Sequence, residues 1–283
     1  MALFSSEQLN FFKFSAVVLD EFPVALRNVF VSMWDNQVAP KHGCQKWDNS
    51  VAVRNLFLGF EGGVPKVPTL NKSYEEWDCT ALFKATLFSQ TFAMSDGSGH
   101  LNTLDKLYVK PRGVSSKAFH TSVMSPGNQA ETFALALDQL RRLRNTLCHQ
   151  TSTWKIDKPT FDHYILLAKD AFAALGQDSN KIDDIGKLGE DDFPTTRVQQ
   201  LEDELRKEKD AAIKFNQVEN HLNQIGSDVK DVKTGVEEMS SDLKEIKANM
   251  EDSNQAKQAE RSKGKSFLDQ NVSVHFTPFT RPT

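Results

Sequence analysis

A heptad repeat in the last third of the chain restricts its fold more than any other sequence feature. Apolar residues alternate there in steps of three and four across more than four heptads, at Val218, Leu222, Ile225, Val229, Val232, Val236, Met239, Leu243, Ile246 and Met250. This spacing predicts a long helix with one apolar stripe, formed by the a and d positions of a coiled coil. Apolar residues from Val198 to Ala212 extend the pattern in a different register, so we expect a discontinuity between residues 208 and 218.

The partner of this stripe can be the chain's own helical domain or another copy of the chain. The rest of the repeat is polar, which favours self-association. The β-branched residues Ile225, Val232 and Ile246 at d positions argue against a simple parallel dimer, and the stoichiometry stays open. We therefore expect a coiled coil over 197–250 and, because its composition turns to Ser, Gln and Lys, a disordered tail over 251–283.

The first 177 residues carry helical patterns and no alternating strand pattern. Helices are expected from an N-cap at Ser6 to about residue 19, from Pro23 to Trp34, from a cap at Ser73 or Asp78 to about Phe92, from about Asn128 to His149 and from Pro159 to Leu175. Long connections rich in Pro and Gly separate them, and the aromatic side chains of the second helix are expected in the core. The sequence therefore predicts an all-α bundle over 1–177 and a polar linker over 178–196.

The helix expected over 128–149 has an unusual polar content. Its leucines form a stripe that faces a core, and Arg144 falls only about 40° from the middle of that stripe. Arg142, Asn145 and His149 gather on the opposite side. A guanidinium beside a core is costly unless something pairs with it, so Arg144 on its own would reach the surface or meet one carboxylate.

Residues 144–149, Arg-Asn-Thr-Leu-Cys-His, resemble the Arg-x4-His motif of HEPN domains. These are small α-helical domains associated with RNA in many ribonucleases, toxins and defence proteins. Segments that begin at Ala25, Glu76 and Ala173 are similar to the HEPN subtype named after the DAZ-interacting zinc-finger ubiquitin ligase. The resemblance covers roughly residues 7–177 and implies a module of an intracellular defence or signalling protein.

The resemblance also implies roles for three residues of the motif. His149 would be the general base or acid, Arg144 would hold the phosphate, and Asn145 would keep the geometry. A proton-transferring group and a cation suit metal-independent cleavage of single-stranded RNA. On an ideal helix Arg144 lies about 140° from His149, so one helix cannot bring both to a phosphate unless its end unwinds. Active HEPN nucleases pair the motif helices of two protomers, and a coiled coil would raise the local concentration for such pairing.

The overall charge limits how RNA could bind. Lys and Arg number 34 against 38 Asp and Glu, which gives a net charge of −4. The chain as a whole therefore does not attract nucleic acid, and any RNA site must be local. The basic segment from Lys106 to Lys117 could contact phosphates, although a solvated loop is the simpler interpretation.

Cysteine usage and hydropathy indicate the compartment. Cys44, Cys79 and Cys148 are widely separated and odd in number, which predicts reduced thiols rather than disulfides or a zinc site. We expect no metal and no cofactor. Lys13 interrupts the first apolar run, and no apolar stretch approaches the roughly 18 residues that span a bilayer. The sequence therefore predicts a cytoplasmic protein without membrane contact.

Three functions remain open from the sequence. The chain could be a HEPN-type endoribonuclease that uses Arg144, Asn145 and His149, or a HEPN module that binds RNA or nucleotide without cutting it. It could also be a non-catalytic helical adaptor, in which Arg144 and Asn145 are buried structural residues and the coiled coil assembles the partners.

Overall fold

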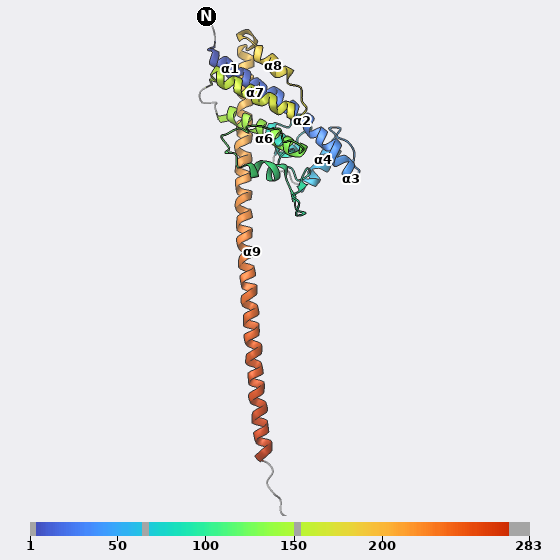
Figure 1. Ribbon diagram of the computed structural model, residues 1–283, viewed down its shortest axis with the longest axis vertical. Helices are drawn as coiled ribbons and strands as arrows, with labels where there is room; N and C mark the ends of the chain where they lie inside the picture. The colour runs from blue at the N-terminus through green and yellow to red at the C-terminus, as the bar shows by residue number, and fades with distance from the viewer. Residues whose placement is uncertain (1–3, 64–67, 150–153, 272–283) are drawn as a thin grey trace, which may run out of the picture. The chain divides into compact units, whose positions relative to one another are not determined.

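The computed structural model describes residues 4–63, 68–149 and 154–271. The chain divides into two compact units, Met1–Val218 and Glu219–Thr283. Helices make up most of the first unit, and the later part of one long helix makes up the described part of the second (Figure 1). This mostly helical structure confirms the all-α class that the sequence predicts.

The helices follow one another with short irregular connections in most places. They are α1 (Ser6–Ala16), α2 (Phe22–Met33), α3 (Ala39–His42), α4 (Val51–Phe60), α5 (Cys79–Ala85), α6 (Gln129–His149), α7 (Lys158–Ala174), α8 (Asn180–Lys187) and α9 (Thr195–Asn271). Two short strands, β1 (Met94–Ser95) and β2 (Leu101–Asn102), pair antiparallel between α5 and α6, with Met94 opposite Asn102.

Wide π-helical turns in the first unit are closely followed by prolines. The turn over Val17–Glu21 precedes Pro23, and the turn over Trp34–Val38 precedes Pro40. Proline has no N–H, and its ring pushes against the carbonyl four residues earlier, so a wider turn accommodates it. Helices α1, α2 and α3 therefore continue into one another from Ser6 to His42.

Two helix ends differ from the sequence-based expectation. The first helix is capped by Ser5 rather than Ser6, because Ser5 and Gln8 form a capping box. Of the two expected caps, Ser73 starts a short 3-10 turn over Tyr74–Glu76 and Asp78 starts α5, which ends at Ala85 rather than near Phe92. The hydroxyl of Thr86 donates to a backbone carbonyl within α5, which weakens continuation of the helix. After α5 the chain leaves the helix, and Ser89 and Thr91 donate hydrogen bonds to Glu61. The sequence pattern around α5 does not predict these contacts.

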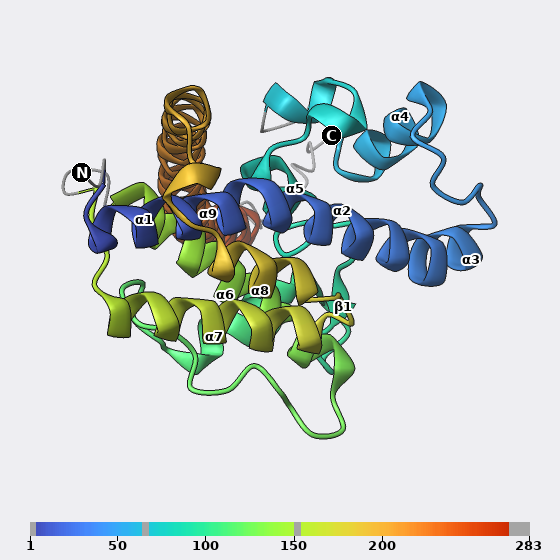
Figure 2. The ribbon, with the colours of Figure 1, turned by 90° about the horizontal axis from the view of Figure 1, so that it is seen from above.

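The core of the first unit lies between α1, α2, α6 and α7. In Figure 2, α1 and α7 run side by side and contact each other, and α7 also contacts α6. A cluster of aromatic rings fills the end near α4 and α5, and its ring-to-ring contacts join Phe30, Trp34, Trp47, Phe57, Tyr74, Trp77 and Phe92. The aromatic residues of α2 are thus core residues, as the helical spacing predicts.

The segment expected as a linker over 178–196 contains α8, whose Ile182 is fully buried. The first turns of α9 also belong to the core of the first unit, because Val198, Leu201 and Leu205 are buried there. These apolar residues are the ones that the sequence shows in a different register from the heptad repeat. The change of register therefore separates a part of α9 that packs in the first unit from a part that belongs to the second.

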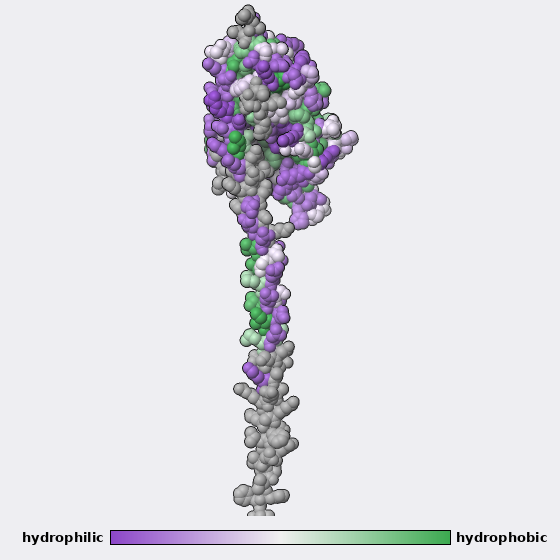
Figure 3. Space-filling model, turned by 90° about the vertical axis from the view of Figure 1, so that its left-hand side faces the viewer, coloured by the Kyte–Doolittle hydropathy of each residue, from purple (hydrophilic) through white to green (hydrophobic). Residues whose placement is uncertain are grey.

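The second unit exposes an apolar stripe along α9. Seven residues of the heptad repeat have side chains between 54% and 67% exposed, namely Val229, Val232, Val236, Met239, Leu243, Ile246 and Met250. Figure 3 shows apolar side chains following one another along this helix. The helix continues to Asn271, beyond the expected end of the coiled coil at residue 250, and residues 272–283 of the expected tail lie outside the described residues. No helix in the described ranges is long and apolar enough to cross a membrane.

Candidate functional site

Helix α6 carries the residues that the sequence singles out. The side chain of Asn128 accepts a hydrogen bond from the backbone N–H of Glu131, which caps the helix where the sequence predicts its start. The leucine stripe is fully buried at Leu137, Leu140, Leu143 and Leu147, as expected from the spacing. This burial fixes the rotation of α6 and therefore decides which polar side chains face the interior.

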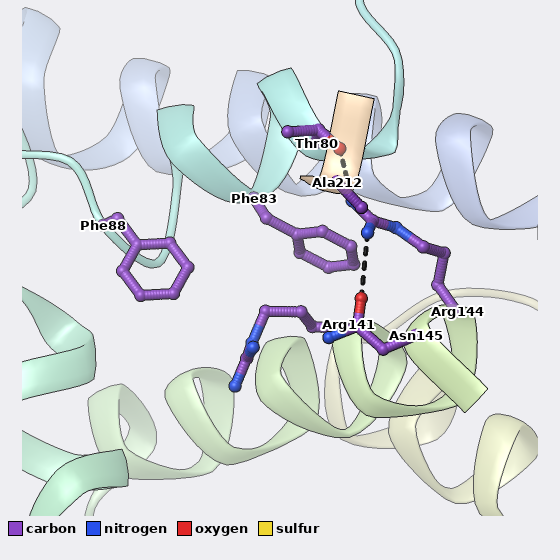
Figure 4. A pocket seen from close by; sticks show the side chains of 7 residues that line it. All are labelled: Thr80, Phe83, Phe88, Arg141, Arg144, Asn145 and Ala212. Carbon is purple, nitrogen blue, oxygen red and sulfur yellow. Dashed lines mark hydrogen bonds between the residues drawn. The ribbon is translucent and has the colours of Figure 1, made fainter. Parts of the chain in front are cut away.

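Arg144 lies inside the protein and is only 4% exposed. Its Nη1 donates to Oδ1 of Asn145 at 2.8 Å, and its Nη2 donates to the hydroxyl of Thr80 on α5 (Figure 4). Its guanidinium also lies 5.7 Å from the centre of the Phe83 ring, a cation–π distance. The motif arginine is therefore held by neighbouring side chains of α5 and α6.

Glu208 supplies the charge that neutralises Arg144. Its Oε2 lies 3.4 Å from Nε of Arg144, and its Oε1 accepts the backbone N–H of Cys79 at 2.9 Å. Burial raises the pKa of Glu208, and the positive charge of Arg144 only partly opposes that effect. Neither Nε of Arg144 nor Oε2 of Glu208 has a hydrogen-bond partner among the described residues. This ion pair links α9 to α6 through electrostatic attraction rather than through a well-formed hydrogen bond.

A small pocket lies beside Arg144, between α5, α6 and α9. It is lined by Thr80, Phe83, Phe88, Arg141, Arg144, Asn145 and Ala212 (Figure 4). Its volume of about 10 Å³ is room for about one water molecule. As the chain is folded, a nucleotide does not fit there.

The third residue of the motif, His149, is the last residue of α6. Its side chain lies outside the described residues. The structure therefore brings two of the three motif residues together, Arg144 and Asn145.

A second buried polar network lies on α6, and the sequence reasoning missed most of it. Asp138 is fully buried and accepts hydrogen bonds from Nε of Arg141 at 2.8 Å and from Nε of Arg142 at 2.5 Å. Its Oδ2 also lies 2.8 Å from Nε2 of His120. Burial opposes ionisation of Asp138, but the hydrogen bond with His120 and the two arginines outweigh it and hold its pKa far below the ordinary value.

The Asp138 network fastens a long connection to α6. Nη1 of Arg142 donates to the carbonyls of Ser115 at 2.5 Å and Ala118 at 2.6 Å. The backbone N–H of His120 donates to the side chain of Gln139. Arg142, which the helical spacing places opposite the leucine stripe, is nevertheless only 5% exposed, because this connection covers it. A signal was present in the sequence, since Asp138 and Arg142 are four residues apart.

Two of the basic residues that could contact phosphates are already paired. Nζ of Lys110 lies 3.4 Å from Asp105, and Nη2 of Arg112 lies 2.5 Å from Glu131. This segment is thus partly neutralised by nearby carboxylates, which weakens its attraction for RNA.

Two buried cysteines, Cys79 and Cys148, lie close to Arg144 and Glu208. Burial raises the pKa of Cys79 well above its ordinary value and that of Cys148 to about 11. Both thiols therefore stay protonated near neutral pH and are poor nucleophiles. Within residues 4–63, 68–149 and 154–271, no group of three or more His, Cys, Asp or Glu side chains could hold a metal ion.

Comparison with known proteins gives no relative. No family model, no curated protein and no solved structure matches the chain. The structure shows a mostly helical fold, and the HEPN resemblance rests on the motif and the sequence segments around it.

Proposed function

We propose that this chain is a non-catalytic helical adaptor that assembles with copies of itself through the heptad repeat of α9. The observation that carries the proposal is the exposed apolar stripe from Val229 to Met250. Apolar side chains repeated at heptad positions are costly to leave in water and pack well against a second helix of the same kind. Burying each of the seven would contribute on the order of 1 kcal/mol, so association has a driving force of several kcal/mol.

The environment of Arg144 supports a structural role for the motif. A residue that clamps a phosphate needs N–H donors that point toward the ligand. Arg144 instead uses its Nη atoms on Asn145 and Thr80 and sets its Nε against Glu208. Buried arginines held in this way fix the packing of helices, which is what an adaptor requires of its folded unit.

The test of the adaptor proposal is the oligomeric state of the full chain. Multi-angle light scattering should give a mass that is a multiple of 31.8 kDa, and Val236→Asp should reduce it to that of one chain, because a buried unpaired carboxylate is costly. Ser241→Asp is the matched control, since Ser241 is exposed on the side of α9 away from the stripe. A wild-type chain that stays monomeric at micromolar to millimolar concentration would refute self-assembly.

A second candidate function is RNA recognition by a HEPN-type module. The pocket beside Arg144 favours it, because Arg141, Arg144 and Asn145 line it together with the rings of Phe83 and Phe88. Guanidinium groups and aromatic rings are the groups that bind phosphates and stack on bases. In this function α9 would have to move, since Ala212 closes one wall and Glu208 neutralises Arg144.

RNA cleavage in EDTA tests this second candidate. The purified chain and His149→Ala should be compared on several single-stranded RNAs, with circular dichroism to show that both are folded. Cleavage that survives EDTA and disappears in the folded variant would establish a metal-independent nuclease and displace the adaptor proposal. RNA binding without cleavage, unchanged in His149→Ala, would indicate a binding module. Absence of both in an assembled chain agrees with the adaptor proposal.

A further inference from the structure

Charged residues flank the exposed apolar stripe of α9 in an ordered way. With Val229, Val236 and Leu243 as a positions, the g positions are Asp228, Gly235, Asp242 and Asn249, and the e positions are Lys233, Ser240 and Lys247. All of these lie on one unbroken helix, and the four charged side chains are exposed. Over residues 228–249 the g positions therefore carry only acidic or neutral residues, and the e positions carry only basic or neutral ones.

This separation of charge distinguishes the two orientations in which copies of the helix can pair. In a parallel coiled coil in register, each g residue faces the e residue five positions further along the partner. Asp228 then faces Lys233 and Asp242 faces Lys247, and Gly235 faces the neutral Ser240. In an antiparallel coiled coil g faces g and e faces e, so aspartates meet only acidic or neutral residues and lysines meet only basic or neutral ones. Residues 228–250 can form opposite-charge pairs across the interface in the parallel arrangement only.

Contacts within a single helix do not remove this preference. Nζ of Lys233 lies 3.9 Å from Glu237, and Asp228 accepts a hydrogen bond from Gln224 at 2.9 Å. Both contacts are exposed and span four residues of the same helix, where such interactions contribute little. They are also present in either orientation, so they cannot favour one over the other.

We infer that copies of α9 associate as a parallel coiled coil in register, with the g aspartates of one chain against the e lysines of the next. The β-branched residues at d positions bear on how many chains associate and not on their orientation. This inference rests on the proposed self-assembly and adds its orientation. Because the first unit precedes the repeat in the sequence, a parallel pair begins with the first units of both chains at the same end of the coil. The adaptor would then present its folded units together rather than at opposite ends.

Cysteine cross-linking of the full chain tests the orientation. Val229→Cys and Ile246→Cys are made separately in a Cys44→Ser background, since Cys79 and Cys148 are buried. Each variant should form a disulfide-linked dimer with itself under mild oxidation. The two positions are about 25 Å apart along a helix, so a refolded mixture of the two variants, distinguished by a size tag, should give no mixed dimer.

The outcomes separate failure of the orientation from failure of self-assembly. If light scattering shows an oligomer while neither variant cross-links to itself, or the mixed dimer dominates, the parallel arrangement is overturned and self-assembly stands. If the chain is monomeric, the proposed function fails and the inference fails with it.

Charge reversal tests the pairs themselves. Asp228→Lys with Asp242→Lys should raise the dissociation constant roughly tenfold or more, because lysines then face lysines. Adding Lys233→Asp and Lys247→Asp to the same chain should restore the wild-type value. In an antiparallel coil g positions face each other, so the two substitutions replace facing aspartates with facing lysines. The dissociation constant would then change little. An unchanged dissociation constant in the variant with Asp228→Lys and Asp242→Lys would therefore contradict the inference.

Discussion

Removing the Arg144 side chain should strand a carboxylate in the core of the first unit. Arg144 forms an ion pair with Glu208, which is itself only 7% exposed, and its positive charge opposes the effect of burial on that carboxyl. In Arg144→Met the packing of the alkyl chain is largely kept, but Glu208 loses its counter-charge, and Thr80 and Asn145 lose a donor. The variant therefore isolates the electrostatic role of the guanidinium.

The expected loss of unfolding free energy is large. Breaking a buried ion pair by removing one partner costs about 3–5 kcal/mol. A domain of this size is stable by about 5–15 kcal/mol, so the variant loses about a fifth of its stability at the least and all of it at the most. Adding Glu208→Gln should recover about 1–3 kcal/mol of that loss, because the amide no longer carries a buried charge and its oxygen can still accept the N–H of Cys79.

The loss should also depend on pH. Burial already raises the pKa of Glu208, and Arg144 opposes that rise, so removing Arg144 raises this pKa further. A raised folded-state pKa means that the folded protein binds the proton more tightly than the unfolded chain does. The penalty is therefore complete above the folded-state pKa and is relieved as the pH falls through it. Arg144→Met should approach the stability of the double variant as the pH is lowered from 7 through the raised pKa of Glu208.

Urea unfolding followed by tryptophan fluorescence measures this effect in the first unit alone. The four tryptophans of the chain, Trp34, Trp47, Trp77 and Trp154, all precede residue 219. Circular dichroism, which also detects the rest of α9, provides the comparison. A loss below about 1 kcal/mol at pH 7 would refute the buried pair, because surface ion pairs contribute that little. The buried pair would also be refuted if the difference in unfolding free energy between Arg144→Met and the double variant with Glu208→Gln did not change with pH.

Three further changes follow from the structure. Asp138→Asn should lower the free energy of unfolding by about 3–5 kcal/mol in a thermal or urea melt. Because the folded-state pKa of Asp138 is depressed, the extra stability of the wild type is complete above the unfolded-state pKa and is lost as the pH falls from there toward the folded-state pKa. Phe30→Ala should cost about 3–5 kcal/mol by urea unfolding, since Phe30 is at the centre of the aromatic cluster; a loss under 1 kcal/mol would contradict that packing. A thiol reagent should react promptly with Cys44 only and reach Cys79 and Cys148 after denaturation; fast reaction of a buried thiol would show that α6 opens.

Local patterns predicted much of the helical framework. The leucine stripe placed α6 and its buried face, Asp78 marked the start of α5, and the prolines marked where helices begin or change. These features depend on residues within one or two turns of each other, so a single sequence contains the information. The heptad repeat likewise predicted one long helix, because its spacing also depends on residues in neighbouring turns.

The tertiary structure alone decided what the polar residues of α6 do. The sequence predicts that Arg144 needs a partner, but its partners Thr80 and Glu208 lie 64 residues away on either side. Arg142 is buried because a distant connection folds over it, and no periodicity within α6 predicts that contact. The spacing of apolar residues along a helix sets which side of the helix faces inward, and that spacing can be read from the sequence of the helix itself. Pairing of buried charges depends on the positions of other elements, and those positions exist only once the chain has folded.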